Sequence, residues 1–184
     1  GSLQNLKQNS HEFGFEVEEI PEQDINDVAV SSTKIRNALN AGNIALANKY
    51  LGYNFFITGK VIKKDGIDNN SSMPSFSVHI NDAFKIVPGC GLYVVVIESH
   101  QKKYKGMLQI ETENISGSLR KSMHLFLFNT STDLHKKQIK VNFIQRLRDE
   151  KKFSTNKEFE LQLESDKEKA LIDALAAKKM SLAE

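Results

Sequence analysis

A run of hydroxyl side chains ahead of a short helix is the first feature of this sequence that could bind a ligand. The run is Ser31, Ser32 and Thr33, and Arg36 follows within the next helical turn. A helix N-terminus offers free backbone N–H groups and partial positive charge, and an arginine adds paired hydrogen bonds to phosphate oxygens. These residues therefore predict a phosphate-binding element. Serine and threonine at a helix start are also ordinary N-caps, so the sequence leaves both interpretations open.

The histidines and the single cysteine do not form a metal-binding pattern. The histidines are His11, His79, His100, His124 and His135, and the cysteine is Cys90. No histidine has another histidine or the cysteine at the spacing of a zinc site, so we expect no metal site built from protein side chains alone. Cys90 lies in a Pro-Gly-Cys-Gly segment, where a turn residue is a better interpretation than a thiol nucleophile.

Basic residues are concentrated between residues 136 and 152, and they could contact phosphate groups. They are Lys136, Lys137, Lys140, Arg146, Arg148, Lys151 and Lys152. The formal net charge of the whole chain is only +2, and few aromatic residues are interleaved with this stretch. Binding to single-stranded nucleic acid normally combines a basic groove with stacking aromatic residues. We therefore expect no nucleic-acid partner.

The elements that would position these residues change from helical to strand periodicity along the chain. The alternation from Phe13 to Val17 predicts one short strand. Ser31 or Ser32 can cap a helix that ends at Gly42, and a second short helix is predicted over residues 44–51. Six segments with strand character follow. They cover residues 55–63, 75–80, 92–98, 104–110, 122–128 and 139–144.

A capping box marks the last helix. Thr155 and Glu158 have the spacing at which each side chain satisfies a free backbone N–H at the start of a helix. Together with the strands, this predicts a mainly β fold. We expect a small six-stranded antiparallel, Greek-key-like barrel with short N-terminal helices and a C-terminal helix packed on it.

Composition sets the broad class of the protein. The chain has 184 residues, of which 40% are hydrophobic and 26% charged, which is typical of one globular domain or of one domain plus a fragment. No apolar run reaches the ~18–20 residues of a membrane helix, so we expect no membrane partner. The single cysteine favours a reducing, cytoplasmic compartment. Gly1 and Ser2 resemble the scar of a removed tag, and we expect a fragment of a longer protein.

Short motifs follow one another in an informative order. They are Ser31-Ser32-Thr33-x-x-Arg36, Gly59-Lys60-Val61, Tyr104-Lys105-Gly106 and Leu147-Arg148-Asp149-Glu150-Lys151-Lys152-Phe153. From about Phe13 to about Ala177, this order resembles the bacterial bifunctional riboflavin kinase/FMN adenylyltransferase family, also called FAD synthetase. The resemblance implies that residues 3–52 are the C-terminal remnant of a nucleotidyltransferase domain. It also implies that residues 53–184 are a riboflavin-kinase-like barrel with its C-terminal helix.

The resemblance implies a reaction, cofactors and partners. The reaction is the ATP-dependent phosphorylation of riboflavin to FMN, with ATP and Mg²⁺ as cofactors. The implied partners are the small-molecule flavin and nucleotide, and a missing N-terminal adenylyltransferase domain in cis. Flavin contacts are implied at Leu147, Arg148, Asp149 and Phe153. Triphosphate contacts of the transferase remnant are implied at Ser31, Ser32, Thr33 and Arg36.

The kinase site departs from the family pattern at its chemical positions. The family's nucleotide and magnesium loop carries Thr and Asn where this chain has Ser75 and Ser77, and Ala where it has Phe76. The family's general-base Glu corresponds to His124, for which the sequence offers no orienting partner. We therefore predict riboflavin kinase activity at least ~100-fold below that of an intact member. The alternative is a non-catalytic module that binds flavin or nucleotide, or that supports the adenylyltransferase half.

Overall fold

The computed structural model describes residues 10, 14, 16, 24–25, 28–63, 73–80, 85–115, 117–128 and 134–180. The chain divides into two units, Gly1–Ser31 and Ser32–Glu184. In the first unit, β1 (Asp24–Ile25) pairs antiparallel with β2 (Val28–Ala29). The strand predicted from Phe13 to Val17 lies largely outside the described residues.

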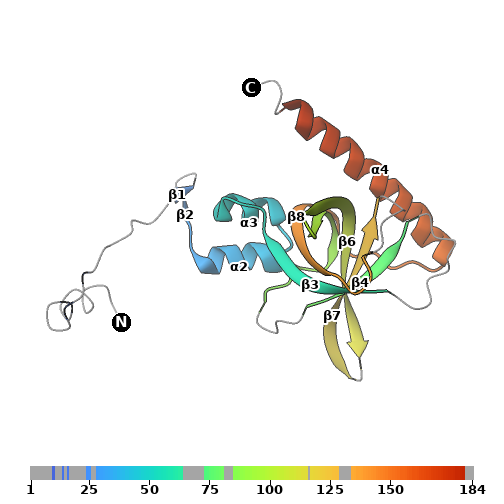
Figure 1. The fold of residues 1–184 in the computed structure, drawn as a ribbon, viewed down its shortest axis with the longest axis horizontal. Coiled ribbons are helices and arrows are strands. Elements are labelled where there is room, and N and C mark those ends of the chain that lie inside the picture. The colour runs from blue at the N-terminus through green and yellow to red at the C-terminus, as the bar shows by residue number, and fades with distance from the viewer. Residues whose placement is uncertain are drawn as a thin grey trace. The chain divides into compact units, whose positions relative to one another are not determined.

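The strands of the second unit close into an antiparallel barrel (Figure 1). They are β3 (Phe56–Lys63), β4 (Ser75–His79), β5 (Gly91–Ser99), β6 (Lys102–Ile115), β7 (Ser118–Leu127) and β8 (Gln138–Arg148). Their order around the barrel is β3-β4-β7-β6-β5-β8, so β4 pairs with β7 and β8 closes onto both β3 and β5. The predicted six-stranded, mainly β barrel is confirmed, and β6, β7 and β8 extend beyond their predicted ranges.

Alternate side chains of the strands build the main hydrophobic core. Its buried strand residues include Ile57, Val61, Phe76, Val78, Tyr93, Val95, Ile97, Leu108, Ile110, Leu125, Val141 and Phe143. Phe76 is 5% exposed and packs in this core, whereas Ser75 and Ser77 face the other way because neighbouring residues of a strand point to opposite faces. The large ring at this position therefore fills the barrel and does not stand beside the serine hydroxyls.

Two glycines from the sequence motifs are required where strands approach closely. A Cβ atom added to Gly106 would lie 2.4 Å from the backbone oxygen of Phe126, and one added to Gly59 would lie 2.7 Å from that of His79. Such contacts would push the paired strands apart, so only glycine fits. Barrel geometry alone therefore explains these two motif positions.

Two short helices precede the barrel, as predicted. They are α2 (Ser32–Asn40) and α3 (Ile44–Leu51). Asn48 joins α3 to the barrel, because its amide nitrogen donates to the backbone oxygen of Phe143 at 3.0 Å and its amide oxygen accepts from the Phe55 N–H at 2.7 Å. The helical pair is thus part of the same compact unit as the barrel.

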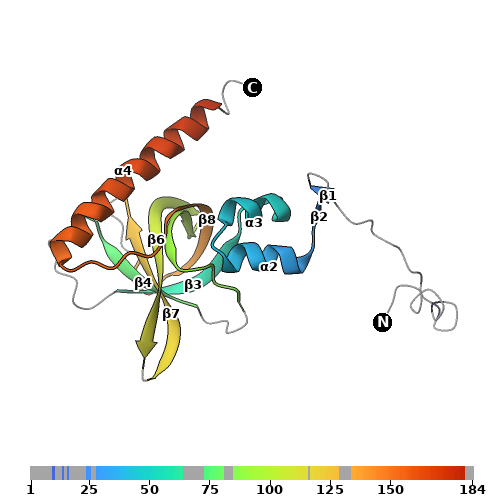
Figure 2. The same ribbon diagram turned by 180° about the vertical axis from the view of Figure 1, so that it is seen from behind.

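The C-terminal helix α4 (Asn156–Met180) packs on the outer surface of the barrel. Thr155 Oγ1 accepts from the Glu158 N–H at 3.2 Å, as predicted, while the Glu158 carboxylate accepts from the Ser154 N–H rather than from that of Thr155. A second hydrophobic cluster lies beneath the helix; it contains Met73, Leu92, Met107, Phe126 and Leu163. The first half of α4 lies on the side of the barrel away from α2 and α3 (Figures 1 and 2).

Candidate functional site

The strands β6 and β7 continue past the barrel as a two-stranded ribbon (Figure 1). The pairing of β6 with β5 reaches Ile110, and the pairing of β7 with β4 begins at His124. From there to Ile115 and Ser118, the described pairs join β6 and β7 to each other. His124 therefore stands where the closed barrel gives way to the ribbon.

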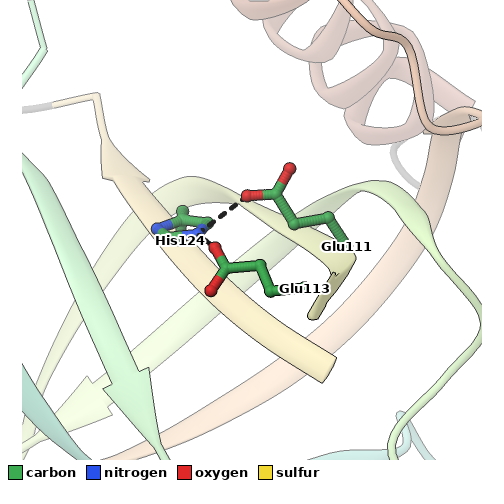
Figure 3. Close-up of side chains that lie close together, drawn as sticks. All are labelled: Glu111, Glu113 and His124. Atoms are coloured by element: carbon green, nitrogen blue, oxygen red, sulfur yellow. Dashed lines mark ion pairs between the residues drawn. The ribbon is translucent and has the colours of Figure 1, made fainter. Parts of the chain in front are cut away.

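Three side chains meet at this transition and form what we call the β6–β7 cluster: Glu111, Glu113 and His124 (Figure 3). Glu111 and Glu113 alternate along β6, so both point to one face of the ribbon. His124 Nε2 lies 2.9 Å from Glu111 Oε1 and 3.4 Å from Glu113 Oε1. The histidine side chain is only 9% exposed. The sequence offered no orienting partner for His124, and the structure supplies two carboxylates from the neighbouring strand.

Ser77 is brought next to His124 by the register of β4 and β7. The two residues are direct cross-strand partners, as are Ser75 and Phe126. Side chains of such partners share a face and have Cβ atoms roughly 5 Å apart. The structure thus places Ser75 and Ser77 on the same outer face as His124. Residues 64–72 of the predicted nucleotide loop lie outside the described residues.

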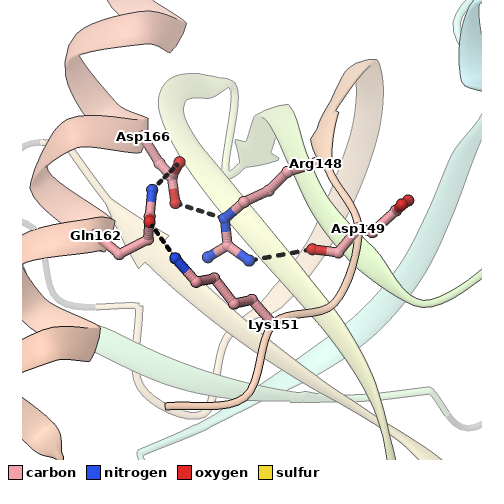
Figure 4. A network of polar contacts seen from close by, with 5 residues as sticks. All are labelled: Arg148, Asp149, Lys151, Gln162 and Asp166. Atoms are coloured by element: carbon pink, nitrogen blue, oxygen red, sulfur yellow. Dashed lines mark hydrogen bonds and ion pairs between the residues drawn. The ribbon is translucent and has the colours of Figure 1, made fainter.

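A polar network joins the end of β8 to α4, and we call it the β8–α4 network (Figure 4). Its members are Arg148, Asp149, Lys151, Gln162 and Asp166. Arg148 Nε donates to Asp166 Oδ2 at 2.7 Å, and the carboxylate is 3% exposed. Gln162 donates to the other oxygen of Asp166 at 3.1 Å and accepts from Lys151 at 2.9 Å. The Asp149 backbone oxygen accepts from Arg148 Nη1 at 3.1 Å.

Three of the predicted flavin-contacting residues gather around this network. The Arg148 guanidinium lies 5.7 Å from the ring centroid of Phe153, and Leu147 packs in the hydrophobic cluster beneath α4. Phe159 connects this region to β7, because its ring lies 5.4 Å from that of Phe153 and 5.9 Å from that of Phe126. The β8–α4 network therefore borders the barrel surface that α4 covers.

Asp149, the fourth predicted flavin-contacting residue, has a different environment. Its side chain is 85% exposed and forms an ion pair with Arg146 at 2.8 Å. Only its backbone oxygen belongs to the β8–α4 network. The carboxylate of Asp149 therefore points away from the Arg148–Asp166 pair.

The predicted transferase-remnant residues lie elsewhere. Ser32, Thr33 and Arg36 are exposed on the first turns of α2, and Ser31 is the last residue of the first unit. The other end of α2 meets the turn before β5, where the Gly89 N–H donates to the backbone oxygen of Leu39. Within the second unit, Ser32, Thr33 and Arg36 belong to α2 and not to the elements that form the β6–β7 cluster.

The sequence comparison decides the family. Residues 51–172 match the family model described as riboflavin kinase, or flavokinase. The chain belongs to the riboflavin kinase family. This domain match covers the whole barrel, the β6–β7 cluster and the β8–α4 network.

Curated relatives and a solved structure resemble this riboflavin kinase domain. The bifunctional riboflavin kinase/FMN adenylyltransferase of Bacillus subtilis is 34% identical over 158 residues, which are 84% of this chain and 49% of the relative. The protein of that name from Escherichia coli K12 is 28% identical over 167 residues, which are 90% of this chain and 53% of the relative. The chain therefore spans about half the length of these relatives. A crystal structure described as a macrolide-efflux protein from Streptococcus pneumoniae superposes with a TM-score of 0.79 at 26% identity, covering 91% of this chain and 54% of that one.

Sequence reasoning missed two residues of each polar site in this riboflavin kinase domain. Glu111 and Glu113 complete the β6–β7 cluster, and Gln162 and Asp166 complete the β8–α4 network. A signal for Asp166 was present, because it falls between Leu163 and Ala170 on the buried stripe of α4. A carboxylate on such a stripe requires a buried cation as partner.

Two hollows on the domain lie away from both polar sites. Their volumes are about 450 and 390 Å³, and Glu98 and Lys103 line both of them. They surround the turn between β5 and β6 and include no residue of the β6–β7 cluster or the β8–α4 network. Among the described helices, none has a stretch apolar enough to cross a membrane.

Proposed function

We propose that this domain phosphorylates riboflavin to FMN with ATP, at a low rate, as the kinase module of an FAD-synthetase-like protein. The family match over residues 51–172 and the bifunctional relatives support the reaction class. The observation that carries the proposal is the register of β4 and β7. It sets the Ser77 hydroxyl beside His124, whose Nε2 atom meets the Glu111 carboxylate. A hydroxyl for phosphate and a base for the substrate thus share one face.

His124 is the proposed general base. In the reaction, the oxygen of the terminal ribityl hydroxyl bonds to the γ-phosphorus of ATP, its proton leaves, and ADP departs. Because His124 Nε2 faces two carboxylates, Nε2 holds the proton and Nδ1 offers the lone pair. Nδ1 has no hydrogen-bond partner among the described residues. The Glu111 carboxylate then stabilises the imidazolium that forms. Its negative charge therefore favours proton transfer to His124 without contacting the substrate.

Ser75 and Ser77 are proposed to contact phosphate oxygens of ATP. Their hydroxyls are neutral oxygen donors on the outer face of β4, and they fit a divalent cation that is also held by phosphate. When bound with ATP, Mg²⁺ would neutralise charge on the phosphates. A serine hydroxyl reaches less far than the amide oxygen of the Asn that the family carries at the position of Ser77. Weaker positioning of the phosphates is therefore one cause of the low rate.

Leu147, Arg148, Asp149 and Phe153 are proposed to contact the flavin. Phe153 offers an aromatic face beside the Arg148 guanidinium. Arg148 Nη2 is buried and has no hydrogen-bond partner among the described residues, although Nε and Nη1 are both engaged. A buried guanidinium N–H without a partner is available to an acceptor atom on a ligand.

The segment of residues 3–52 is proposed to be the remnant of an adenylyltransferase domain that acts in cis, in the cytoplasm. Ser31, Ser32, Thr33 and Arg36 would contact the triphosphate there. The family's transferase also needs a His-x-Gly-His-type motif, and this sequence has none. We therefore expect no FAD when this chain is incubated with FMN and ATP.

A paired turnover assay tests the kinase proposal. FMN formation is measured for the chain and for a Ser77→Asn/His124→Glu variant, with Phe76 retained because it packs in the core. We expect slow FMN formation by the chain and a rate at least ~100-fold higher in the variant. Glu98→Gln, a carboxylate change near the β5–β6 turn, should leave the rate unchanged.

The outcomes separate the proposal from its alternative. Riboflavin binding without turnover in either protein would favour a non-catalytic flavin-binding module. Turnover by the unaltered chain at the rate of the restored variant would refute the low-rate proposal. Failure to bind either riboflavin or ATP in calorimetric titrations would refute the kinase assignment.

A further inference from the structure

The geometry of the β6–β7 cluster points to a metal site. We propose that His124 Nε2 and the carboxylates of Glu111 and Glu113 bind a divalent cation of the Zn²⁺ class. The site lies on the barrel–ribbon transition and needs neither flavin nor nucleotide. Its existence is therefore independent of the proposed kinase function.

The distances within the cluster suit a shared cation. Metal bonds to imidazole nitrogen and carboxylate oxygen are about 2.0–2.2 Å long, so neighbouring ligand atoms lie roughly 2.9–3.5 Å apart in octahedral or tetrahedral sites. His124 Nε2 lies 2.9 Å and 3.4 Å from the two carboxylates, and all three ligand atoms fall within 4.8 Å of one another. Figure 3 shows the three side chains converging from β6 and β7.

Unpartnered buried atoms at the same place give an independent reason. Among the described residues, Gln109 Oε1, Ser122 Oγ and His124 Nδ1 are buried without a hydrogen-bond partner, whereas His124 Nε2 meets the two carboxylates. Gln109 is the cross-strand partner of His124, and Ser122 that of Glu111. Gln109 is 6% exposed, and its amide nitrogen donates to Glu111 at 3.1 Å, which holds its carbonyl oxygen beside the cluster.

An ion pair alone does not account for this arrangement. A protonated His124 would satisfy Nε2, but it would leave Gln109 Oε1 buried as an acceptor without a donor. Leaving such a group buried and unpaired destabilises the folded chain. The atoms that converge here are Lewis bases, namely an imidazole nitrogen and carboxylate oxygens. These lone pairs have too few hydrogen-bond donors around them, and a bound cation would satisfy them.

The ligand types select among cations. Imidazole with carboxylates suits Zn²⁺ and its first-row neighbours, whereas Mg²⁺ and Ca²⁺ prefer oxygen ligands alone. Three protein ligands also leave a coordination position open. Gln109 supports the site as a positioning residue, because its amide orients the Glu111 carboxylate.

Metal binding and base catalysis require opposite tautomers of His124. A cation on Nε2 uses the Nε2 lone pair, so the ring proton must sit on Nδ1. The proposed kinase base needs the proton on Nε2 and the lone pair on Nδ1. If the kinase proposal holds, Zn²⁺ should therefore suppress FMN formation, and a chelator selective for Zn²⁺ over Mg²⁺ should restore it.

The primary test measures metal binding without substrates. The chain is treated with chelator, buffer-exchanged and titrated calorimetrically with Zn²⁺, and Co²⁺ absorption reports the coordination geometry. We expect one equivalent of Zn²⁺ to bind. Glu111→Gln and Glu113→Gln should each weaken the affinity at least ~10-fold, and Gln109→Ala by about 10-fold. Glu98→Gln and His100→Ala remove a carboxylate and an imidazole outside the cluster and should change the affinity less than about twofold.

Three results would overturn the site. They are no stoichiometric Zn²⁺ binding, equal loss of affinity in Glu111→Gln and Glu98→Gln, and a Co²⁺ spectrum that is unchanged in the Glu113→Gln variant. Glu113 is the most exposed member of the cluster, so its amide variant is expected to fold, and circular dichroism checks this. Zn²⁺ binding without kinase activity would leave the metal site standing and remove only the proposed function.

Discussion

The β6–β7 cluster and the β8–α4 network are both polar groups packed on the outside of the same barrel, yet their bonding differs. In the network, each oxygen of Asp166 accepts a hydrogen bond, and Arg148 donates from two of its nitrogens. In the cluster, two carboxylates meet one histidine, and neighbouring buried atoms lack partners among the described residues. The network is nearly complete without a ligand, whereas the cluster is not.

This difference indicates two different roles for polar groups on the outside of this barrel. The network fastens α4 to β8 and, through Phe153 and Phe159, to the hydrophobic cluster beneath the helix. The cluster lies where β6 and β7 leave the barrel, and buried atoms beside it have no hydrogen-bond partner among the described residues.

Removal of the histidine should give the largest functional effect. For His124→Ala, we expect riboflavin kinase activity to fall a further ~10²-fold or more, because general-base contributions are typically ~10²–10⁴-fold. His100→Ala, in the turn between β5 and β6, serves as the matched control and should remain within about twofold. FMN formation under saturating ATP is the measurement. If the His124→Ala variant forms FMN at a rate close to that of the unaltered chain, His124 is not the general base.

Removal of the buried carboxylate of the network should give the largest effect on stability. Asp166→Ala leaves the Arg148 guanidinium without its partner, and breaking a buried ion pair costs about 3–5 kcal/mol of unfolding free energy. For a chain of this size each kcal/mol corresponds to roughly 2–4 °C in Tm. Urea unfolding and thermal melts measure both quantities.

The control for this variant is Asp149→Ala, which removes a carboxylate that is also paired with an arginine. Because that side chain is largely exposed, its ion pair with Arg146 should contribute no more than about 1 kcal/mol. Equal destabilisation by the two variants would contradict the distinction between a buried network and a surface pair.

The sequence predicted the scaffold because local patterns determine it. Alternation identified the strands, and the capping box at Thr155 marked the start of α4. The alternation of residues in β4 also predicts the direction of the Phe76 side chain. Phe76 and Val78 lie on one face of the strand, and Ser75 and Ser77 lie on the other. An inward Phe76 therefore followed from strand periodicity.

The two polar sites could not be predicted to the same extent, because they depend on how elements meet. The contact between His124 and Glu111 depends on the register of β6 and β7, and a shift of one residue would turn one of them to the other face. The Arg148–Asp166 pair depends on the way α4 docks on β8, which no local motif specifies. The sequence contains all of these residues, but only the folded structure shows which of them lie next to one another.

The buried hydroxyl of Tyr93 offers the test of this comparison with the smallest expected effect. Tyr93 is fully buried at the start of β5, and its hydroxyl donates to the backbone oxygen of Gly89. Burial raises the pKa of Tyr93 above its ordinary 10.0, and the positive charge of Arg146 opposes part of that rise. We expect Tyr93→Phe to cost about 1–2 kcal/mol at pH 7, because the Gly89 oxygen loses its donor.

The pH dependence of this cost has a definite sign. Below pH 10 the phenol is neutral in both the folded and the unfolded chain, so its stabilising effect is fully present. Above pH 10 the unfolded chain releases the proton first, and the effect is lost as pH rises through the higher folded pKa. Urea unfolding of both proteins at pH 8 and at pH 11 isolates this effect, since the other titrating groups are common to both. The difference in unfolding free energy between the unaltered chain and Tyr93→Phe should shrink at pH 11. A constant difference would show that burial does not raise the pKa of Tyr93.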